Sequence, residues 1–217
     1  MSNDKLVKPS TSWRISTMVR PEKYQASDLL TRAMDLFWTR GYERTSVRDL
    51  ENRLDLRAPA IYRRFGDKEA LFAQVVEHYV ATVVVPRIES YLGTSDDPVV
   101  DLYRFFRTAH SERGCVLTNT ATECGQGPPQ VRARVLDGLE RMRAALQVEL
   151  ERAHEQGALH RDPIAASHEL LLAMQGLMVM SRLGIDGDTA RSLTRTVFAS
   201  MFPDHPHFGQ GVHDRAR

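Results

Sequence analysis

The chain has 217 residues, of which 42% are hydrophobic and 26% are charged, and its formal net charge is +1. This is enough apolar sequence to bury a sizeable core in one or two domains, and two cysteines do not make a disulfide framework. The charge is unevenly placed, because residues 1–72 carry 14 Lys and Arg against 10 Asp and Glu, while the rest carry 15 against 18. A basic amino-terminal part on an acidic body is typical of a nucleic-acid reader joined to another unit.

The sequence contains no stretch that we expect to reach membrane-spanning length, and its amino terminus is polar where a signal peptide needs an apolar run. We therefore expect a cytoplasmic protein without a membrane partner. Cys115 and Cys124 are nine residues apart, so on one helix they would lie on opposite faces and could not be bridged.

Residues 1–22 lack hydrophobic periodicity and place Lys5, Lys8, Arg14 and Arg20 among Ser, Thr and Pro. We expect a flexible arm. A basic arm can reach a minor groove, but an ordinary disordered terminus is the favoured interpretation. Trp13 in this arm is unexplained.

The first predicted helix spans residues 24–40 and ends at Gly41. Its expected buried side carries Ala26, Leu29, Leu30, Ala33 and Phe37.

Two short helices joined by a tight turn are predicted next, between Thr45 and Phe72, followed by the start of a longer helix. Val47, Leu50 and Leu54 recur at helical spacing on one face. Ser46, with Asp49 three residues later, forms a capping-box pattern, and Thr45 is the alternative cap.

Cations surround the second of these helices. Small residues occupy its start at Ala58 and Pro59, which lets the backbone approach another surface closely. The flanking side chains are Arg57, Tyr62, Arg63, Arg64 and Lys68. This is the arrangement that a major-groove reader requires, although a helical hairpin with a solvated basic face has the same pattern.

The segment resembles the DNA-binding domain of the TetR family of bacterial transcriptional regulators. The matching pieces, which cover about a quarter of the chain, are Gly41-Tyr42, Thr45-Ser46-Val47-Arg48-Asp49-Leu50, Ile61-Tyr62, Phe65 and Lys68-Glu69-Ala70-Leu71-Phe72. One departure is Asp55, which stands where the inter-helix turn usually has Gly. Because Asp tolerates the left-handed conformation better than most residues, we expect the turn to be kept.

The resemblance implies a role for each of these positions. Base contacts are implied for Arg48, Arg57, Ala58 and Pro59, and phosphate contacts for Thr45, Ser46, Tyr62, Arg64 and Lys68. Arg63 has no single implied role, since it can contact bases, contact phosphates or point to solvent.

A long helix is predicted over residues 67–91, with Asp67 as its cap and Pro86 expected to kink or end it. Its apolar stripe is Phe72, Val75, Val76, Tyr79 and Val83. In the resembled family this helix transmits ligand binding to the DNA-binding domain.

Four further helical regions follow, at residues 98–110, 129–155, 163–183 and 188–202, and the first part of RGCVLTNTATECGQGPP is expected to be helical too. The RGC-L-TNTA-E run resembles a stretch of one large subgroup of the family. No strand pattern or internal repeat is present, and residues 203–217 are expected to be disordered.

Residues 163–183 contain LLLAMQGLMVM, which is apolar nearly all round and predicts a helix that is buried on most sides. The last two helices either fill the core of one subunit or form a two-fold four-helix interface. We favour the interface, because the family pairs its last helices in this way and paired half-sites require a dimer.

An effector pocket in the carboxy-terminal domain is implied by the resemblance. The candidates are Tyr103, Phe106, His110, Cys115, Asn119, Met142, Met174 and Met178. Core packing is the competing explanation for each. Cys115 near His110 and Arg113 could have a lowered thiol pKa and sense electrophiles or oxidants, but an inert buried thiol is the favoured interpretation.

No metal site is predicted, because the histidines at 154, 160, 205, 207 and 213 match no structural zinc spacing. No phosphate loop, nucleophile motif or HExxH pair points to an enzyme, and no cofactor is expected. The sequence thus predicts an all-α protein, with an arm at 1–22, a three-helix helix-turn-helix domain at 23–70, an effector-binding and dimerisation domain at 71–202 and a tail at 203–217.

The predicted function is that of a homodimeric repressor that a small molecule of unknown identity releases from a palindromic double-stranded operator. Two alternatives stay open. One is a constitutive regulator or activator without an effector, and the other is a helical enzyme or interaction module that carries a DNA-binding unit.

Overall fold

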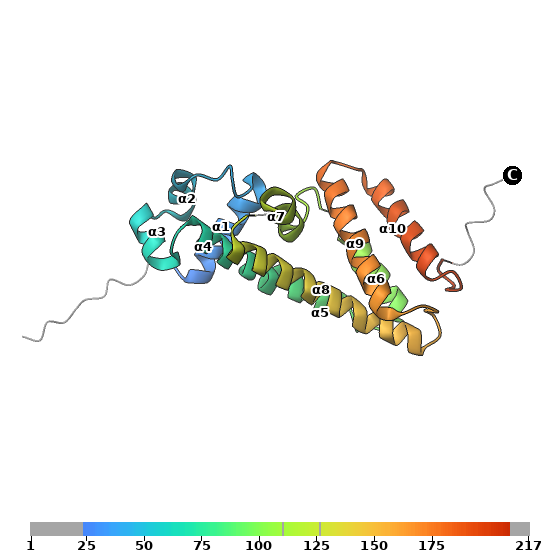
Figure 1. Cartoon of the computed structure of the whole chain (residues 1–217). Helices are drawn as coiled ribbons and strands as arrows, with labels where there is room; N and C mark the ends of the chain where they lie inside the picture. Colours follow the sequence, from blue (N-terminus) through green and yellow to red (C-terminus); the bar gives the residue numbers. More distant parts are fainter. Residues whose placement is uncertain (1–23, 110, 126, 209–217) are drawn as a thin grey trace, which may run out of the picture.

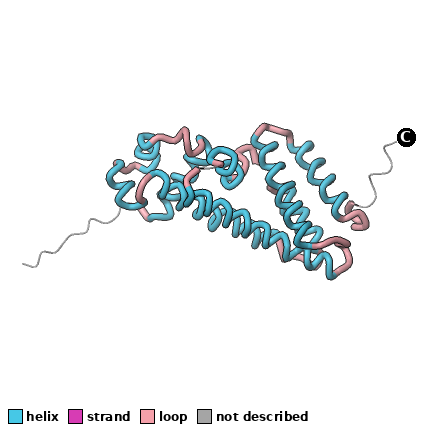
Figure 2. Tube along the Cα trace, viewed as in Figure 1, coloured by secondary structure: helices cyan, strands magenta, loops and turns pink. Residues whose placement is uncertain are grey.

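The computed structural model describes residues 24–109, 111–125 and 127–208, and within these ranges every regular element is helical (Figure 2). The predicted all-α class is confirmed. The elements are α1 (Ala26–Arg40), α2 (Val47–Leu54), α3 (Ala58–Phe65), α4 (Lys68–Tyr79), η1 (Val80–Val84), α5 (Val85–Tyr91), α6 (Pro98–Arg107), α7 (Val116–Cys124), α8 (Pro129–Glu155), α9 (Pro163–Arg182) and α10 (Gly187–Met201). The predicted arm at 1–22, with Trp13, lies outside the described residues.

The first three helices form a small unit at one end of the molecule (Figure 1). α1 ends at Gly41, whose φ of 85° is easily adopted only by glycine. Ser46, not Thr45, caps α2, and the reciprocal bonds with Asp49 complete the predicted capping box. The apolar faces meet in a core that includes Leu29, Phe37, Leu50, Leu54, Ile61 and Phe65, whereas Ala26 is exposed.

The helix predicted at 67–91 is continuous, but its middle turn is widened. Pro86 does not end this helix, but it interrupts the regular α-helical hydrogen bonds, because proline has no backbone N–H to donate to the carbonyl four residues earlier. Val85 donates instead to the carbonyl of Val80, and residues 80–84 form a π-helical turn.

α8 is the longest helix of the described chain and runs beside α4 and η1 toward the far end of the molecule, where α6, α9 and α10 gather (Figure 1). Its bounds match the prediction, and its buried apolar side chains include Val131, Val135, Met142, Leu146 and Leu150. Because α4 and α8 pack together, the amino-terminal unit is braced against the rest of the chain.

The prediction of a disordered tail from residue 203 is wrong for residues 203–208. Phe208 is buried, with its ring 4.9 Å from the Tyr103 ring and 5.6 Å from the Phe198 ring. His205 Nε2 lies 3.1 Å from Asp97 Oδ2. Burial of the Phe208 ring favours an ordered conformation of residues 203–208.

The expectation that no segment reaches membrane-spanning length is also wrong. Two stretches, Lys68–Tyr91 and Pro163–Arg182, are long and apolar enough to cross a membrane by length and composition. This is weak evidence for a membrane span, because the core helix of a soluble protein passes the same test. Both stretches pack against other helices of the chain, α4 on α1 and α8, and α9 on α8 and α10.

Candidate DNA-binding face and ligand pocket

The α2–turn–α3 unit is held at its corner by backbone and side-chain contacts. Asp55 ends α2 in the left-handed conformation, with φ 54° and ψ 42°, so the turn is formed without the glycine that is usual there. Glu51 on α2 accepts a 2.8 Å hydrogen bond from the N–H of Ala58, which is the first residue of α3. This bond satisfies one free donor of the α3 amino terminus and fixes α3 against α2.

The outer face of this unit carries most of the side chains that are predicted from the sequence to contact DNA. The exposed ones are Ser46, Arg48, Arg57, Pro59, Tyr62 and Arg63, while Ala58, Arg64 and Lys68 are half-buried. Tyr62 is 39% exposed even though it follows the buried Ile61. The structure thus brings these predicted residues together on one helix pair and the start of α4.

Thr45 is the exception. Its side chain is fully buried, and its hydroxyl donates a 2.6 Å hydrogen bond to the carbonyl of Gly41. A buried hydroxyl with this bond does not reach a phosphate, so the structure rules out a phosphate contact from the Thr45 side chain. The next residue, Ser46, is exposed and remains a candidate for a phosphate contact.

Lys68 starts α4 beside the tip of α3. Its Nζ lies 4.3 Å from the centre of the Tyr42 ring, which stacks on the Phe72 ring at 4.8 Å. A cation over an aromatic face is held in place without being neutralised by a carboxylate. Lys68 is therefore positioned as a charged group next to the exposed face of α3.

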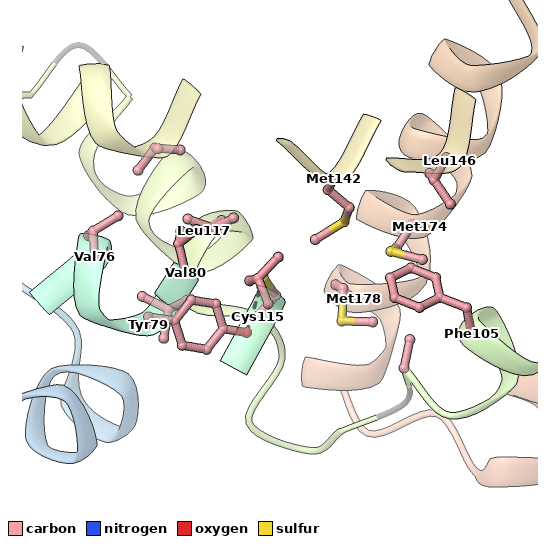
Figure 3. Packing of buried hydrophobic residues seen from close by; sticks show 14 of the residues in the cluster. Val76, Tyr79, Val80, Phe105, Cys115, Leu117, Met142, Leu146, Met174 and Met178 are labelled. Carbon is pink, nitrogen blue, oxygen red and sulfur yellow. Dashed lines mark hydrogen bonds between the residues drawn. The ribbon is translucent and has the colours of Figure 1, made fainter. Parts of the chain in front are cut away.

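A cavity of about 130 Å³ lies between the amino-terminal unit and the carboxy-terminal helices. It is lined by Trp38, Tyr79, Val83, Val84, Arg87, Phe105, Thr108, Ala109, Ser111, Gly114, Cys115, Met142, Met174, Gln175 and Met178. Figure 3 shows Tyr79 and Cys115 on one side and three methionines from α8 and α9 facing them. Methionines are adaptable and suit an apolar ligand.

Four of the eight predicted pocket residues line this cavity: Cys115, Met142, Met174 and Met178. Tyr103 and Phe106 do not line it, because both rings pack on Phe198 at the opposite side of α6. Asn119 does not line it either, since its amide donates to the carbonyl of Arg113. His110 lies outside the described residues.

Several lining residues were not predicted as ligand contacts. Tyr79 was assigned to the apolar stripe of its helix, but its hydroxyl donates to Cys115 Sγ at 3.5 Å, and burial raises the pKa of that hydroxyl. Arg87 enters from the π-bulged helix and donates at 2.8 Å to the carbonyl of Thr108, and burial lowers its pKa. The polar end of a tyrosine in an apolar stripe is the one signal that could have identified Tyr79 from sequence.

Cys115 is buried, as the favoured interpretation of its thiol requires. Its side chain is 6% exposed. Arg113, which the alternative interpretation as a sensor placed beside the thiol, is engaged elsewhere, since its guanidinium donates at 2.8 Å to Asp35 and lies 4.3 Å from the Trp38 ring centre. Tyr79 is the hydrogen-bond partner of the thiol.

An apolar face is exposed on the last two helices. Leu172 is 70% and Leu183 76% exposed, and Ile164, Val179, Met180 and Leu193 are exposed as well. The prediction that the 163–183 helix is buried on most sides is therefore wrong for the single chain. An apolar groove of about 250 Å³ lies between α9 and α10, and Gly176 on this face has open space where a side chain would be.

Among the described residues, no group of three or more His, Cys, Asp or Glu side chains is arranged to hold a metal ion.

Comparison with protein families gives two matches. Residues 29–75 match the family described as "Bacterial regulatory proteins, tetR family", and residues 99–197 match "Tetracyclin repressor-like, C-terminal domain". The first match covers the helix-turn-helix unit, and the second covers most of α6 to α10.

Individual proteins give the same result. The HTH-type transcriptional repressor ComR of Escherichia coli K12 is 25% identical over 177 residues, which is 76% of this chain and 83% of ComR. The uncharacterized HTH-type transcriptional regulator YezE of Bacillus subtilis 168 is 26% identical over 150 residues, covering 66% of this chain and 77% of YezE. Among solved structures, a cysteine mutant of the TetR family regulator CifR, complexed with 26-bp operator DNA, superimposes with a TM-score of 0.73 at 23% identity, covering 83% of this chain and 99% of that one.

Proposed function

Because the chain belongs to the TetR family and is a transcriptional regulator that binds DNA, we propose that it acts as a homodimeric repressor that a small molecule releases from a palindromic operator. Three parts of the molecule support the three parts of this proposal. They are the outer face of α2 and α3, the apolar face of α9 and α10, and the cavity between the two domains.

The observation that carries DNA reading is the position of α3. Its first turn presents exposed Arg57 and Pro59, and Glu51 fixes its amino terminus against α2. A small residue at the helix start lets the backbone approach base edges, and an arginine beside it can make a bidentate contact to guanine. We assign base contacts to Arg48, Arg57, Ala58 and Pro59, and phosphate contacts to Ser46, Tyr62, Arg64 and Lys68, with Arg63 able to do either.

Dimerisation is supported by the uncovered apolar face. Exposed leucines as large as Leu172 and Leu183, beside an apolar groove, favour burial against a second copy. Gly176 would let a partner helix approach closely. Two copies would then present two α3 helices, which is what a palindromic site requires.

The cavity is the proposed effector site. Its size and its thioether lining suit a small, largely apolar molecule. A molecule there can release DNA only if it binds the two states of the dimer unequally. We propose no catalytic role and no cofactor, and we assign the protein to the cytoplasm, where its operator lies. Sensing by Cys115 stays a hypothesis, which fails if alkylation of Cys115 leaves operator affinity unchanged.

Operator selection from random duplex DNA tests the proposal. The wild type should enrich a palindromic sequence, and size measurement of the complex should give two protomers per duplex. Tyr62→Ala should enrich the same site more weakly, while replacement of Arg141, which is exposed on α8, by Ala should leave the enrichment of the wild-type site unchanged. If the wild type enriches no sequence, the proposal is contradicted. The alternative of a helical enzyme or interaction module is then favoured.

A further inference from the structure

Trp38 belongs to α1 of the amino-terminal unit, yet its half-buried side chain lines the cavity. Its ring packs edge-on against the Tyr79 ring, with centroids 5.2 Å apart and planes at 79°. Tyr79 in turn donates to Cys115 across the cavity wall. A molecule in this cavity therefore touches a residue of the DNA-binding unit directly, besides touching the carboxy-terminal helices.

The loop between α6 and α7 holds the Trp38 ring on two sides. Trp38 Nε1 donates a 3.0 Å hydrogen bond to the carbonyl of Arg113, and the guanidinium of Arg113 lies 4.3 Å from the centre of the ring. The same carbonyl accepts a 2.9 Å bond from Asn119 in α7. The indole ring therefore cannot shift without breaking these contacts or moving the loop with it.

From Arg113 the contacts lead on to the helix-turn-helix unit. Its guanidinium donates to Asp35 Oδ1 at 2.8 Å and to Thr39 Oγ1 at 3.2 Å, both on α1. The other oxygen of Asp35 pairs with Arg53 near the end of α2. One carboxylate thus joins the loop beside the cavity to the helix that supports α3.

We propose that Trp38 is an effector-contacting residue and that the Trp38–Arg113–Asp35–Arg53 contacts carry the state of the cavity to α2, alongside the long helix α4–η1–α5. This inference rests on the proposed function, since it requires both an operator and an effector. The competing explanation is that Trp38 only fills space between the domains. That explanation gives no role to the carbonyl of Arg113 or to the shared carboxylate of Asp35.

A double-mutant cycle at the cavity tests this without knowledge of the effector. Cys115→Phe places a ring inside the cavity as a built-in occupant, and operator affinity is measured with Trp38 present and with Trp38→Ala. We expect Cys115→Phe to weaken operator binding about tenfold or more in the Trp38 protein, and at least about threefold less strongly when Trp38 is Ala, because the long helix still links the cavity to the DNA-binding unit. Melting curves establish that each variant is folded.

The outcomes separate the inference from the proposed function. Equal weakening in both backgrounds means that the cavity is coupled to DNA through other residues, which overturns the inference and leaves the proposed function intact. No weakening in the Trp38 protein, with wild-type operator binding normal, overturns both the inference and effector release.

A second measurement covers the case in which Cys115→Phe does not fold. The chain has two tryptophans, so Trp13→Phe leaves Trp38 as the single tryptophan, whose emission can be excited selectively over that of the tyrosines. Because coupling is reciprocal, saturating operator should change the emission or the quencher accessibility of Trp38, and Arg113→Ala should reduce that change. A duplex of scrambled sequence is the control. Identical emission and quenching with and without operator would overturn the inference.

Discussion

Glu123 on α7 accepts a 3.0 Å hydrogen bond through Oε1 from the backbone N–H of Glu43, in the loop between α1 and α2. The contact joins the carboxy-terminal domain to the helix-turn-helix unit at a second point, away from Arg113. It also fills the space beside Gly41, where a Cβ would lie 2.5 Å from both carboxylate oxygens of Glu123. Glycine is thus favoured at position 41 by its positive φ, and a side chain there would also displace the Glu123 carboxylate from the N–H of Glu43.

Gly41→Ala should lower the free energy of unfolding by more than the cost of its backbone conformation, which is about 1–3 kcal/mol. Gly157→Ala is the matched control, because Gly157 also has positive φ but no atom lies within 4 Å of where its Cβ would be. Urea denaturation should show the larger loss for Gly41→Ala, and Glu123→Ala should restore part of it. Equal losses of unfolding free energy in the two variants would show that contact between the new Cβ and Glu123 does not destabilise the Gly41→Ala protein.

Asp55 gives a second prediction, because its left-handed conformation is costly for a residue with a Cβ. Asp55→Gly removes that cost but loses the 3.1 Å hydrogen bond from the Tyr24 hydroxyl, whereas Asp55→Ala loses the bond and keeps the cost. We expect Asp55→Ala to be less stable than Asp55→Gly by about 1–2 kcal/mol in urea denaturation. Tyr24→Phe isolates the lost bond. Equal stability of the two Asp55 variants would show that the turn is not strained.

Leu172→Glu should convert the protein to monomers, because it places a charge at the centre of the exposed apolar face of α9. Sedimentation velocity measures the change, and operator affinity should fall with it. Leu136→Glu is the control, since Leu136 is 54% exposed on α8. A Leu172→Glu protein that stays dimeric would exclude this face as the interface.

The helices and the DNA-binding face were largely predictable from the sequence, because their signals are local. Ser46 and Asp49 mark a cap, Pro129 and Gly157 bound the long helix, and the arginines around Ala58 follow a spacing. The burial of the Thr45 side chain could not be predicted in this way. It depends on the position of the Gly41 carbonyl, to which the Thr45 hydroxyl donates, and not on the residue type at position 45.

The cavity was only half predictable, for a different reason. Its methionines were found, but the side of α6 that faces the cavity depends on how α6 packs, and this turned Tyr103 and Phe106 toward Phe198. Trp38 was missed because a wall contributed by the other domain has no signature in the sequence. Both the orientation of α6 and the position of Trp38 depend on packing between helices that are far apart in the sequence.

Asp101 leads to a prediction on pH. Its carboxylate is fully buried and accepts hydrogen bonds from the backbone N–H groups of Thr94 and Ser95 at 2.8 and 2.9 Å. Burial alone raises the pKa of Asp101, but the bonds from Ser95 and Thr94 outweigh it and hold the pKa below its ordinary value of 3.8. A lowered folded-state pKa contributes stability above the unfolded value, and that contribution is lost as the pH falls through the folded value.

Asp101→Asn should therefore lower the free energy of unfolding by about 1–3 kcal/mol at neutral pH, because it replaces hydrogen bonds to a charged acceptor by weaker bonds to a neutral amide. The difference from the wild type should shrink as the pH falls below 3.8. Urea denaturation across this range measures it, with Asp96→Asn, at an exposed position, as the control. A difference that is constant with pH would show that the charge of Asp101 is not responsible.

The most direct test of the whole account is the affinity for the selected operator, measured by fluorescence anisotropy over a range of salt concentrations. Tyr62→Ala and Lys68→Ala should each weaken binding about tenfold or more, since each removes a contact to phosphate. Lys68→Ala should also reduce the salt slope by about 1, while Arg141→Ala should stay within about twofold of the wild type. If both variants bind the operator as tightly and with the same salt slope as the wild type, the face built on α3 and the start of α4 is not the DNA-binding surface.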